Sequence, residues 1–293
     1  MQGVRFYTPG AIAVLLATIH HWLKQKREVN FLNIESAPAC QYWQRMDFFE
    51  QCGLALPETF ARRDSSGRFV SLKRIRAGAQ GRVAAIAGEI AACLFPAQAK
   101  LDDPDQTGAL DLVEYATTEL INNVLQHAHS DGFILAQVYP RQNVVRLAIA
   151  DFGIGIRGSF EETKPPFWKS MLNDLDAIQL ALNPKISSKT HVGGAWGMEA
   201  ANAGVGLSII KELAFDTDGI FTLASHAGFH QFNHIERNAY PVELTLPVPF
   251  PGTLCALQVS KTKLTNNQIL LRRAKERLHL LDKTHPFDNL FES

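Results

Sequence analysis

The sequence predicts an α/β protein, because segments with the apolar spacing of amphipathic helices alternate with short apolar runs typical of buried strands. Residues 131–140 (DGFILAQVYP) and 143–153 (NVVRLAIADFG) predict two strands joined by a short turn, which is a β-hairpin. Residues 220–228, 241–249 and 252–260 predict three further strands. The strands therefore fall into two groups, with a long connection between them.

The first sixty residues predict helices and a strand of their own. Pro9 begins an apolar helix that runs to about Lys26, residues 28–36 (EVNFLNIES) predict a buried strand, and residues 37–53 predict a second helix. This helix–strand–helix order, together with the stretch YWQRMDFFEQCGL, resembles STAS-type domains, the fold of anti-sigma-factor antagonists. The resemblance implies a small α/β STAS-like module over residues 1–60.

The other segments predict a linker, helices, a lid and a tail. Residues 61–77 are rich in Arg and Lys and predict a basic linker, whereas residues 78–95 and 208–219 predict helices. Residues 157–203 form a connection long enough to be a functional lid, in which DLDAIQLAL has helical periodicity and the Gly- and Ala-rich end predicts mobility. Residues 261–293 predict a basic helical tail with an apolar stripe.

Composition excludes several classes of protein. The 293 residues carry 29 Lys and Arg against 29 Asp and Glu, so no overall field favours nucleic acid or a membrane surface. The four cysteines are scattered and contain no C-x-x-C pair, which is typical of reduced thiols in a cytosol. The longest apolar run, residues 11–19, is too short to span a bilayer. We expect a cytoplasmic protein that binds no membrane, and its balanced charge does not favour nucleic acid as a partner.

A row of polar residues stands out within the apolar stretch YATTELINNVLQHAHS. Glu119, Asn123 and His127 repeat at a spacing of four, and residues four apart lie one turn above another on the same helix face. Polar groups among core residues cost free energy unless a partner satisfies them. His127 has a simpler interpretation as a helix C-terminal residue or a hydrogen-bonding neighbour, because His favours helix C-termini.

Two glycine-containing motifs follow this helix. In the first, Asp151, Gly153 and Gly155 alternate where a strand ends, and a carboxylate there can accept a hydrogen bond from an exocyclic amine while glycines let backbone approach a flat ring. In the second, Gly204 and Gly206 precede a helix, whose free N–H groups form an anion site. Each motif alone is weak, since short glycine runs are common in turns.

The ordered set of motifs resembles the Bergerat-fold (GHKL) ATPases. That superfamily includes gyrase, the ninety-kilodalton heat-shock chaperone, histidine kinases and mismatch-repair ATPases. The resemblance covers about residues 78–260, and the Glu-Asn-His spacing looks closest to the anti-sigma-factor serine kinases. It implies an α+β two-layer sandwich, with a mixed sheet and helices on one face.

The resemblance also implies ATP and Mg²⁺ as cofactors and a role for each motif residue. Glu119 would orient or deprotonate the nucleophile, Asn123 would ligate magnesium, and Asp151 would bind the adenine amine. The remaining residues implied to lie around the nucleotide are His127, Gly153, Gly155, Ile156, Gly204, Gly206, Leu207 and Thr253.

Two functions remain open from the sequence. As an enzyme, the protein would hydrolyse ATP or phosphorylate a Ser or Thr of a protein substrate as part of a regulatory switch. As a binding module, it would be a nucleotide-controlled switch, in which ATP exposes or hides a surface for a protein partner. The carboxylate of Glu119 favours the enzyme.

Overall fold

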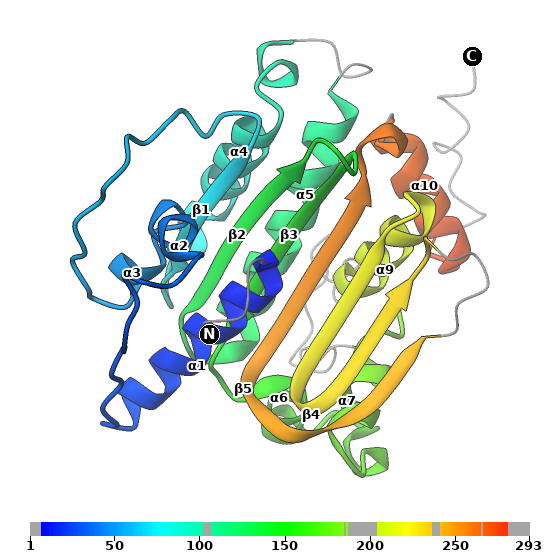
Figure 1. The fold of residues 1–293 in the computed structure, drawn as a ribbon. Coiled ribbons are helices and arrows are strands. Elements are labelled where there is room, and N and C mark those ends of the chain that lie inside the picture. Colours follow the sequence, from blue (N-terminus) through cyan, green and yellow to red (C-terminus); the bar gives the residue numbers. More distant parts are fainter. Residues whose placement is uncertain are drawn as a thin grey trace.

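The computed structural model describes residues 7–101, 107–184, 186, 204–235, 241–264 and 266–280. Five strands form one sheet in the order β1-β2-β3-β5-β4, and helices pack on both of its faces (Figure 1). The strands are β1 (Phe69–Ile75), β2 (Gly132–Tyr139), β3 (Val144–Asp151), β4 (Ile220–Asn233) and β5 (Val242–Ser260). The predicted α+β sandwich is therefore confirmed. Every paired strand in the described chain is antiparallel, so the mixed sheet that we expected is wrong.

One face of the sheet carries a layer of long helices, drawn behind the strands in Figure 1. The layer consists of α4 (Val83–Leu94), α5 (Gly108–Asn123), α9 (Gly206–Asp216) and α10 (Asn267–Arg277). Leu112 and Leu120 of α5 pack in one core with Ile134 of β2 and Leu147 of β3. This layer packs the apolar face of α5 against the sheet.

The N-terminal segment covers the opposite face, where α1 (Pro9–Lys24) crosses in front of the strands (Figure 1). Ile12 and Leu16 of α1 pack in a second core with Phe133 and Leu135 of β2. Alternate residues of β2 thus point into two different cores, which explains why this strand is apolar along most of its length. The expectation of helices on one face concerned residues 78–260, whose long helices α4, α5 and α9 lie on that face, and the N-terminal segment adds the helices on the other face.

The strand predicted at residues 28–36 does not form. Asn33 has a φ of +55°, and the N–H of Ala37 donates to the carbonyl of Ile34, so this segment turns instead of extending. Residues 7–60 contribute three helices and no strand. After α1, the next regular elements are α2 (Cys40–Arg45) and α3 (Phe48–Gln51). The strand on which the STAS-like resemblance depended is absent from these described residues.

The predicted linker over residues 61–77 contains the edge strand β1. Its basic residues favour a linker when only the neighbouring sequence is considered, because the acidic residues that pair with them are far along the chain. Lys73 pairs with Glu89 at 2.9 Å, and Arg74 pairs with Asp131 at 2.7 Å. The burial of Leu72 and Ile75 between these exposed charges is what makes the segment a strand.

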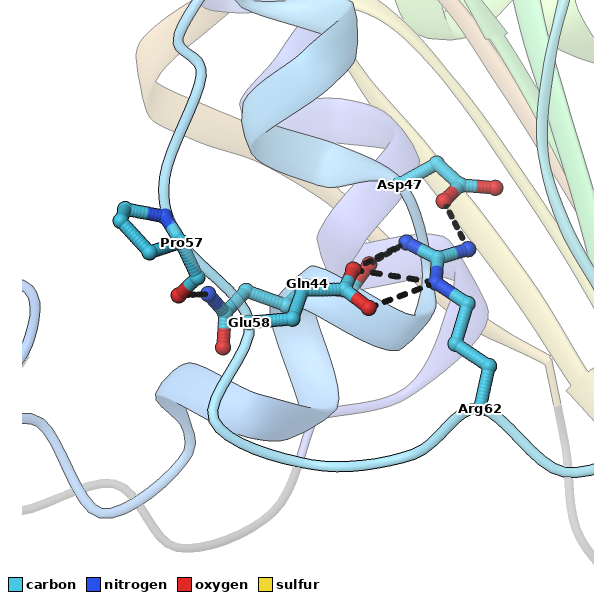
Figure 2. Close-up of polar contacts among 5 residues, drawn as sticks. All are labelled: Gln44, Asp47, Pro57, Glu58 and Arg62. Carbon is cyan, nitrogen blue, oxygen red and sulfur yellow. Dashed lines mark hydrogen bonds and ion pairs between the residues drawn. The ribbon is translucent and has the colours of Figure 1, made fainter.

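The loop that leads to β1 is fixed by polar contacts around Arg62 (Figure 2). The Arg62 guanidinium donates to Asp47 Oδ1 at 2.6 Å and to the Gln44 carbonyl at 3.0 Å, and it also binds the carboxylate of Glu58. The Gln44 amide in turn donates to the Pro57 carbonyl at 2.9 Å. Residues 57–62 are therefore attached to α2 and α3 rather than free.

β4 bends back on itself near His226, which has a φ of +47°. The bend lets the Gly219 carbonyl accept from the N–H of His234 at 2.8 Å, at opposite ends of the strand. β5 pairs with both arms, with Ser225 opposite Thr253 and Phe229 opposite Leu244. The strands predicted at 241–249 and 252–260 are thus parts of one long strand.

The predicted lid and tail are described only in part. The first part of the connection contains α6 (Gly155–Thr163) and α7 (Asp174–Ala181), and the latter is the predicted helical stretch. Residues 187–203, including the Gly- and Ala-rich end, and residues 281–293 of the tail lie outside the described residues. No helix in the described part of the chain is long and apolar enough to cross a bilayer.

Candidate functional site

The elements that carry the motif residues meet where β3 ends, near α6 and the bend of β4 at the lower edge of the sheet in Figure 1. Five segments contribute: the end of α5, the loop after β3, the bend of β4, the Gly252–Thr253 part of β5 and the start of α9.

The polar row of α5 does not continue as an α-helix through His127. The α-helix ends at Asn123, and Val124–Ala128 form one π-helical turn. A π-turn holds more residues than an α-turn and occurs often at functional sites. The spacing of four therefore places Glu119 and Asn123 on one face, whereas His127 follows a different geometry. Its Nδ1 lies 3.3 Å from Ser159 Oγ of α6, so His127 joins α5 to α6.

The amide nitrogen of Asn123 is buried and has no hydrogen-bond partner among the described residues. Its Nδ2 is buried without a hydrogen bond, and neither amide atom bonds to any residue in the described chain. Because amide oxygen and nitrogen are placed by their partners, either atom can take the buried position. An unpaired buried amide costs free energy, so a ligand is a natural partner for this group.

Glu119 lies half-buried beside the first residue of α9. Its carboxylate occupies the space where a β-carbon of residue 206 would be, so only glycine fits at Gly206 without a shift. Burial raises the pKa of Glu119 above its ordinary value. A carboxylate at the N-terminus of a helix is also stabilised by the free N–H groups there. Glu119 therefore has a structural role next to any chemical one.

Asp151 is the last residue of β3 and is 4% exposed. Its Oδ1 accepts from the N–H of Gly153 at 2.9 Å and from the N–H of Thr253 at 3.2 Å. Burial raises the pKa of Asp151 to about 6, and these two N–H groups oppose the rise. Among the described residues no hydrogen bond reaches Oδ2, which leaves one carboxylate oxygen as a free acceptor.

The glycines after Asp151 are required by close packing. A β-carbon on Gly153 would overlap the carbonyl of Ala128, at the end of the π-turn. Gly155 has a φ of +71°, and a β-carbon there would overlap the His226 ring. The loop is thus pressed between α5 and the bend of β4.

Ser225 and His226 hold this loop, and no sequence motif points to either residue. Ser225 Oγ accepts from the N–H of Ile156 at 2.9 Å and lies 3.4 Å from Thr253 Oγ1. His226 Nε2 donates to the Ile154 carbonyl at 2.9 Å. A Ser-His pair inside a predicted strand is unremarkable until the strand bends.

The start of α9 meets the start of α6 through apolar contacts. Leu207 and Ile156 both pack against the small core that contains Phe160 and Met171. Gly204, with a φ of +80°, leads into this helix. The structure thus brings Asp151, the residues 153–156 and Thr253 into one bonded group and places Glu119 against Gly206. No hydrogen bond in the described chain joins Asp151 to Glu119 or Asn123.

Comparison with family models, with curated proteins and with solved structures found no match to this chain. Among the described residues, no group of three or more His, Cys, Asp and Glu side chains could hold a metal ion. A divalent cation at this site would therefore depend on the amide oxygen of Asn123 and on oxygens of its ligand.

Proposed function

We propose that this chain binds ATP with Mg²⁺ where β3 ends, as the resemblance to Bergerat-fold ATPases implies, and hydrolyses ATP or phosphorylates a protein Ser or Thr within a regulatory switch. The arrangement of Asp151 carries the proposal. One carboxylate oxygen is fixed by two backbone N–H groups and the other has no hydrogen bond within the described chain. A fixed acceptor beside close-packed glycines suits the exocyclic amine and flat ring of adenine.

The unpaired amide of Asn123 supports the magnesium part of the proposal. Mg²⁺ in nucleotide sites keeps most of its ligands as water and phosphate oxygens and takes one or two from the protein. The amide oxygen of Asn123 would be such a ligand, and the unbonded Nδ2 could donate to a phosphate oxygen of the same nucleotide. When bound, the cation would neutralise charge on the triphosphate.

Glu119 would be the base in the enzymatic form of the proposal. Its raised pKa brings it nearer to neutrality, where a general base works best. Glu119 lies beside Gly206, at the N-terminus of α9. This helix N-terminus is where the second glycine motif would bind the phosphates. A carboxylate and a phosphate there would repel each other, so we expect phosphate binding at Gly206 to depend strongly on Mg²⁺.

The same contact supports the second candidate, a nucleotide-controlled switch that binds ATP without turning it over. The carboxylate of Glu119 would then serve only to stabilise the start of α9. Nucleotide binding would change this contact and so shift α9, and Glu119 would not activate a nucleophile. A protein partner would then recognise the surface changed by the nucleotide.

Incubation of the purified chain with γ-labelled ATP and Mg²⁺ tests the proposal. The measurements are free phosphate, label on protein, and ATP affinity by calorimetry. In Glu119→Gln we expect ATP binding to persist while turnover falls by about 10²–10⁴-fold. In Asn123→Ala we expect weaker binding in the presence of Mg²⁺ and little difference in its absence. Asn122→Ala and Glu114→Gln, on the same helix, are the matched controls.

Each outcome separates the candidates. Binding without released phosphate or labelled protein contradicts the enzyme and supports the switch. Loss of binding in Glu119→Gln as complete as in Asn123→Ala would show that the two roles are assigned wrongly. Absence of ATP binding by the wild-type chain rejects both candidates.

A further inference from the structure

A cavity of about 220 Å³ lies in the N-terminal segment, between α1, residues 29–37, α2 and α3. It is separate from the loop at Asp151 and is not needed for the proposed ATP site. For comparison, an apolar cavity of about 150 Å³ in a protein core is enough to bind benzene. The volume here therefore suits a molecule with one aromatic ring or two fused rings.

Aromatic rings from four segments surround this cavity. Trp22 comes from α1, Phe31 from the irregular segment, Trp43 from α2 and Phe49 from α3. Trp43 and Phe49 lie nearly parallel at a centroid distance of 6.3 Å, and Phe31 meets Phe49 edge-on at 6.2 Å. Such rings favour offset or edge-to-face contact with another flat ring, at about 0.5–1.5 kcal/mol for each pair.

The lining carries no charge. None of the side chains that line the cavity is Asp, Glu, Lys, Arg or His. The only thiol there, Cys40, has a pKa raised by burial and stays neutral. The polar groups are few, and Trp43, which is 4% exposed, makes no hydrogen bond through its indole N–H in the described chain. A charged ligand would lose its hydration here without gaining a partner.

The wall formed by residues 29–37 can admit a ligand from solvent. This wall contains no helix or strand, and Leu32 is 82% exposed. Trp22, opposite it on α1, is 38% exposed. We propose that this cavity is a binding site for a small, neutral aromatic molecule of about the size of indole.

Binding of indole to the full-length chain, measured by calorimetry and by saturation-transfer NMR, tests the proposal. We expect saturable binding at one site and a higher unfolding temperature with indole present. Ala37→Phe, which fills the cavity from the irregular segment, should weaken binding at least tenfold. Ala79→Phe adds the same side chain at a turn that does not line the cavity and should leave binding unchanged. Ile34→Phe is a second filling variant if Ala37→Phe does not fold.

Four results would contradict a site for a neutral aromatic molecule in this cavity. Absence of saturable indole binding by the wild-type chain overturns the proposal, as does equal binding by the Ala37→Phe and Ala79→Phe variants. Equal affinity for indole-3-carboxylate overturns the requirement for a neutral ligand. If a chain lacking residues 1–6 binds indole and the full-length chain does not, residues 1–6 compete with indole for the cavity and the proposal is wrong.

Discussion

The backbone N–H of Thr253 donates to Asp151 Oδ1 at 3.2 Å and ties the end of β3 to β5. This bond and that of Gly153 occupy the same oxygen, so the orientation of the carboxylate is set by the backbone of the loop after β3 and of β5. Substituting the side chain of Thr253 would leave the bond in place. The useful substitutions are therefore at Asp151 and at the residues packed around it.

The first prediction concerns the preference of the site for adenine over guanine nucleotides. Because the Asp151 carboxylate only accepts hydrogen bonds when ionised, ATP should bind more tightly than GTP, whose six-position oxygen is also an acceptor. Leaving the group unpaired costs about 1–3 kcal/mol. Asp151→Asn replaces the free oxygen with a donor, so it should weaken ATP binding and narrow the difference from GTP. Calorimetry with Asp64→Asn as an exposed control measures this, and equal affinities in the wild type would reject the assignment.

The second prediction concerns pH and stability. The pKa of Asp151 is about 6 in the folded chain against an ordinary 3.8, so between these values the folded state binds more protons than the unfolded state. The free energy of unfolding should therefore fall as pH rises from about 4 to about 6, by on the order of 3 kcal/mol. Asp151→Asn keeps an oxygen for both N–H groups but does not titrate.

Urea unfolding of both proteins at pH 4 and at pH 7 measures this effect. Relative to the wild type, the Asp151→Asn variant should be more stable at pH 7 than at pH 4 by about the same amount. A stability difference that does not change with pH would contradict a buried, titrating carboxylate at this position.

The third prediction concerns the contact between Glu119 and Gly206. Alanine at the start of a helix is ordinarily favourable, but a β-carbon at 206 would overlap the Glu119 carboxylate. Because that carboxylate is the end of a flexible side chain and can move, Gly206→Ala should destabilise the chain by only about 0.5–1.5 kcal/mol, the cost of pushing a side chain off its rotamer. Gly81→Ala, where a β-carbon meets only open space, is the control. In a Glu119→Ala background the cost at 206 should largely disappear, and two costs that simply add would show that the residues do not touch.

The fourth prediction tests whether the N-terminal segment is an independent module. Leu16 is fully buried in the core that α1 shares with β2 and β3. Leu16→Ala should cost about 2–5 kcal/mol and lower the temperature of one cooperative transition that includes the sheet. Leu23→Ala, at an exposed position of the same helix, should change stability little. Two separate transitions, with only one lowered by Leu16→Ala, would indicate a separable module.

The sequence was sufficient for the elements whose pattern is local. The β2–β3 hairpin could be predicted because both strands are apolar and separated by a short polar turn, and α9 could be predicted from its periodicity. β1 could not, because Lys73 and Arg74 dominate its composition and their partners Glu89 and Asp131 are distant in sequence. The prediction of a strand at 28–36 was wrong although its composition is apolar. The apolar residues of this segment line a cavity instead of joining a sheet.

The candidate site shows the same division. Asp151 and its glycines could be chosen from their spacing, because a strand end followed by glycines is a local signal. The π-turn after Asn123 could not, since nothing in VLQHA distinguishes it from an α-helix. Ser225 and His226 could not either, because their contacts depend on a bend in β4 that only the packing of the whole sheet defines.

The position of β5 between β3 and β4 has a consequence for the order of folding during synthesis. Asp151 and Thr253 are separated by 102 residues, so the loop at Asp151 cannot take its final form until nearly the whole sheet has been translated. The first helix waits still longer, because α1 also packs against Leu254 and Ala256 of β5. The hairpin and α5 can assemble early from contacts near in sequence, whereas these distant contacts close slowly. α1 thus leaves the ribosome well before the strands that bury it, and its apolar face is exposed to other chains in the meantime.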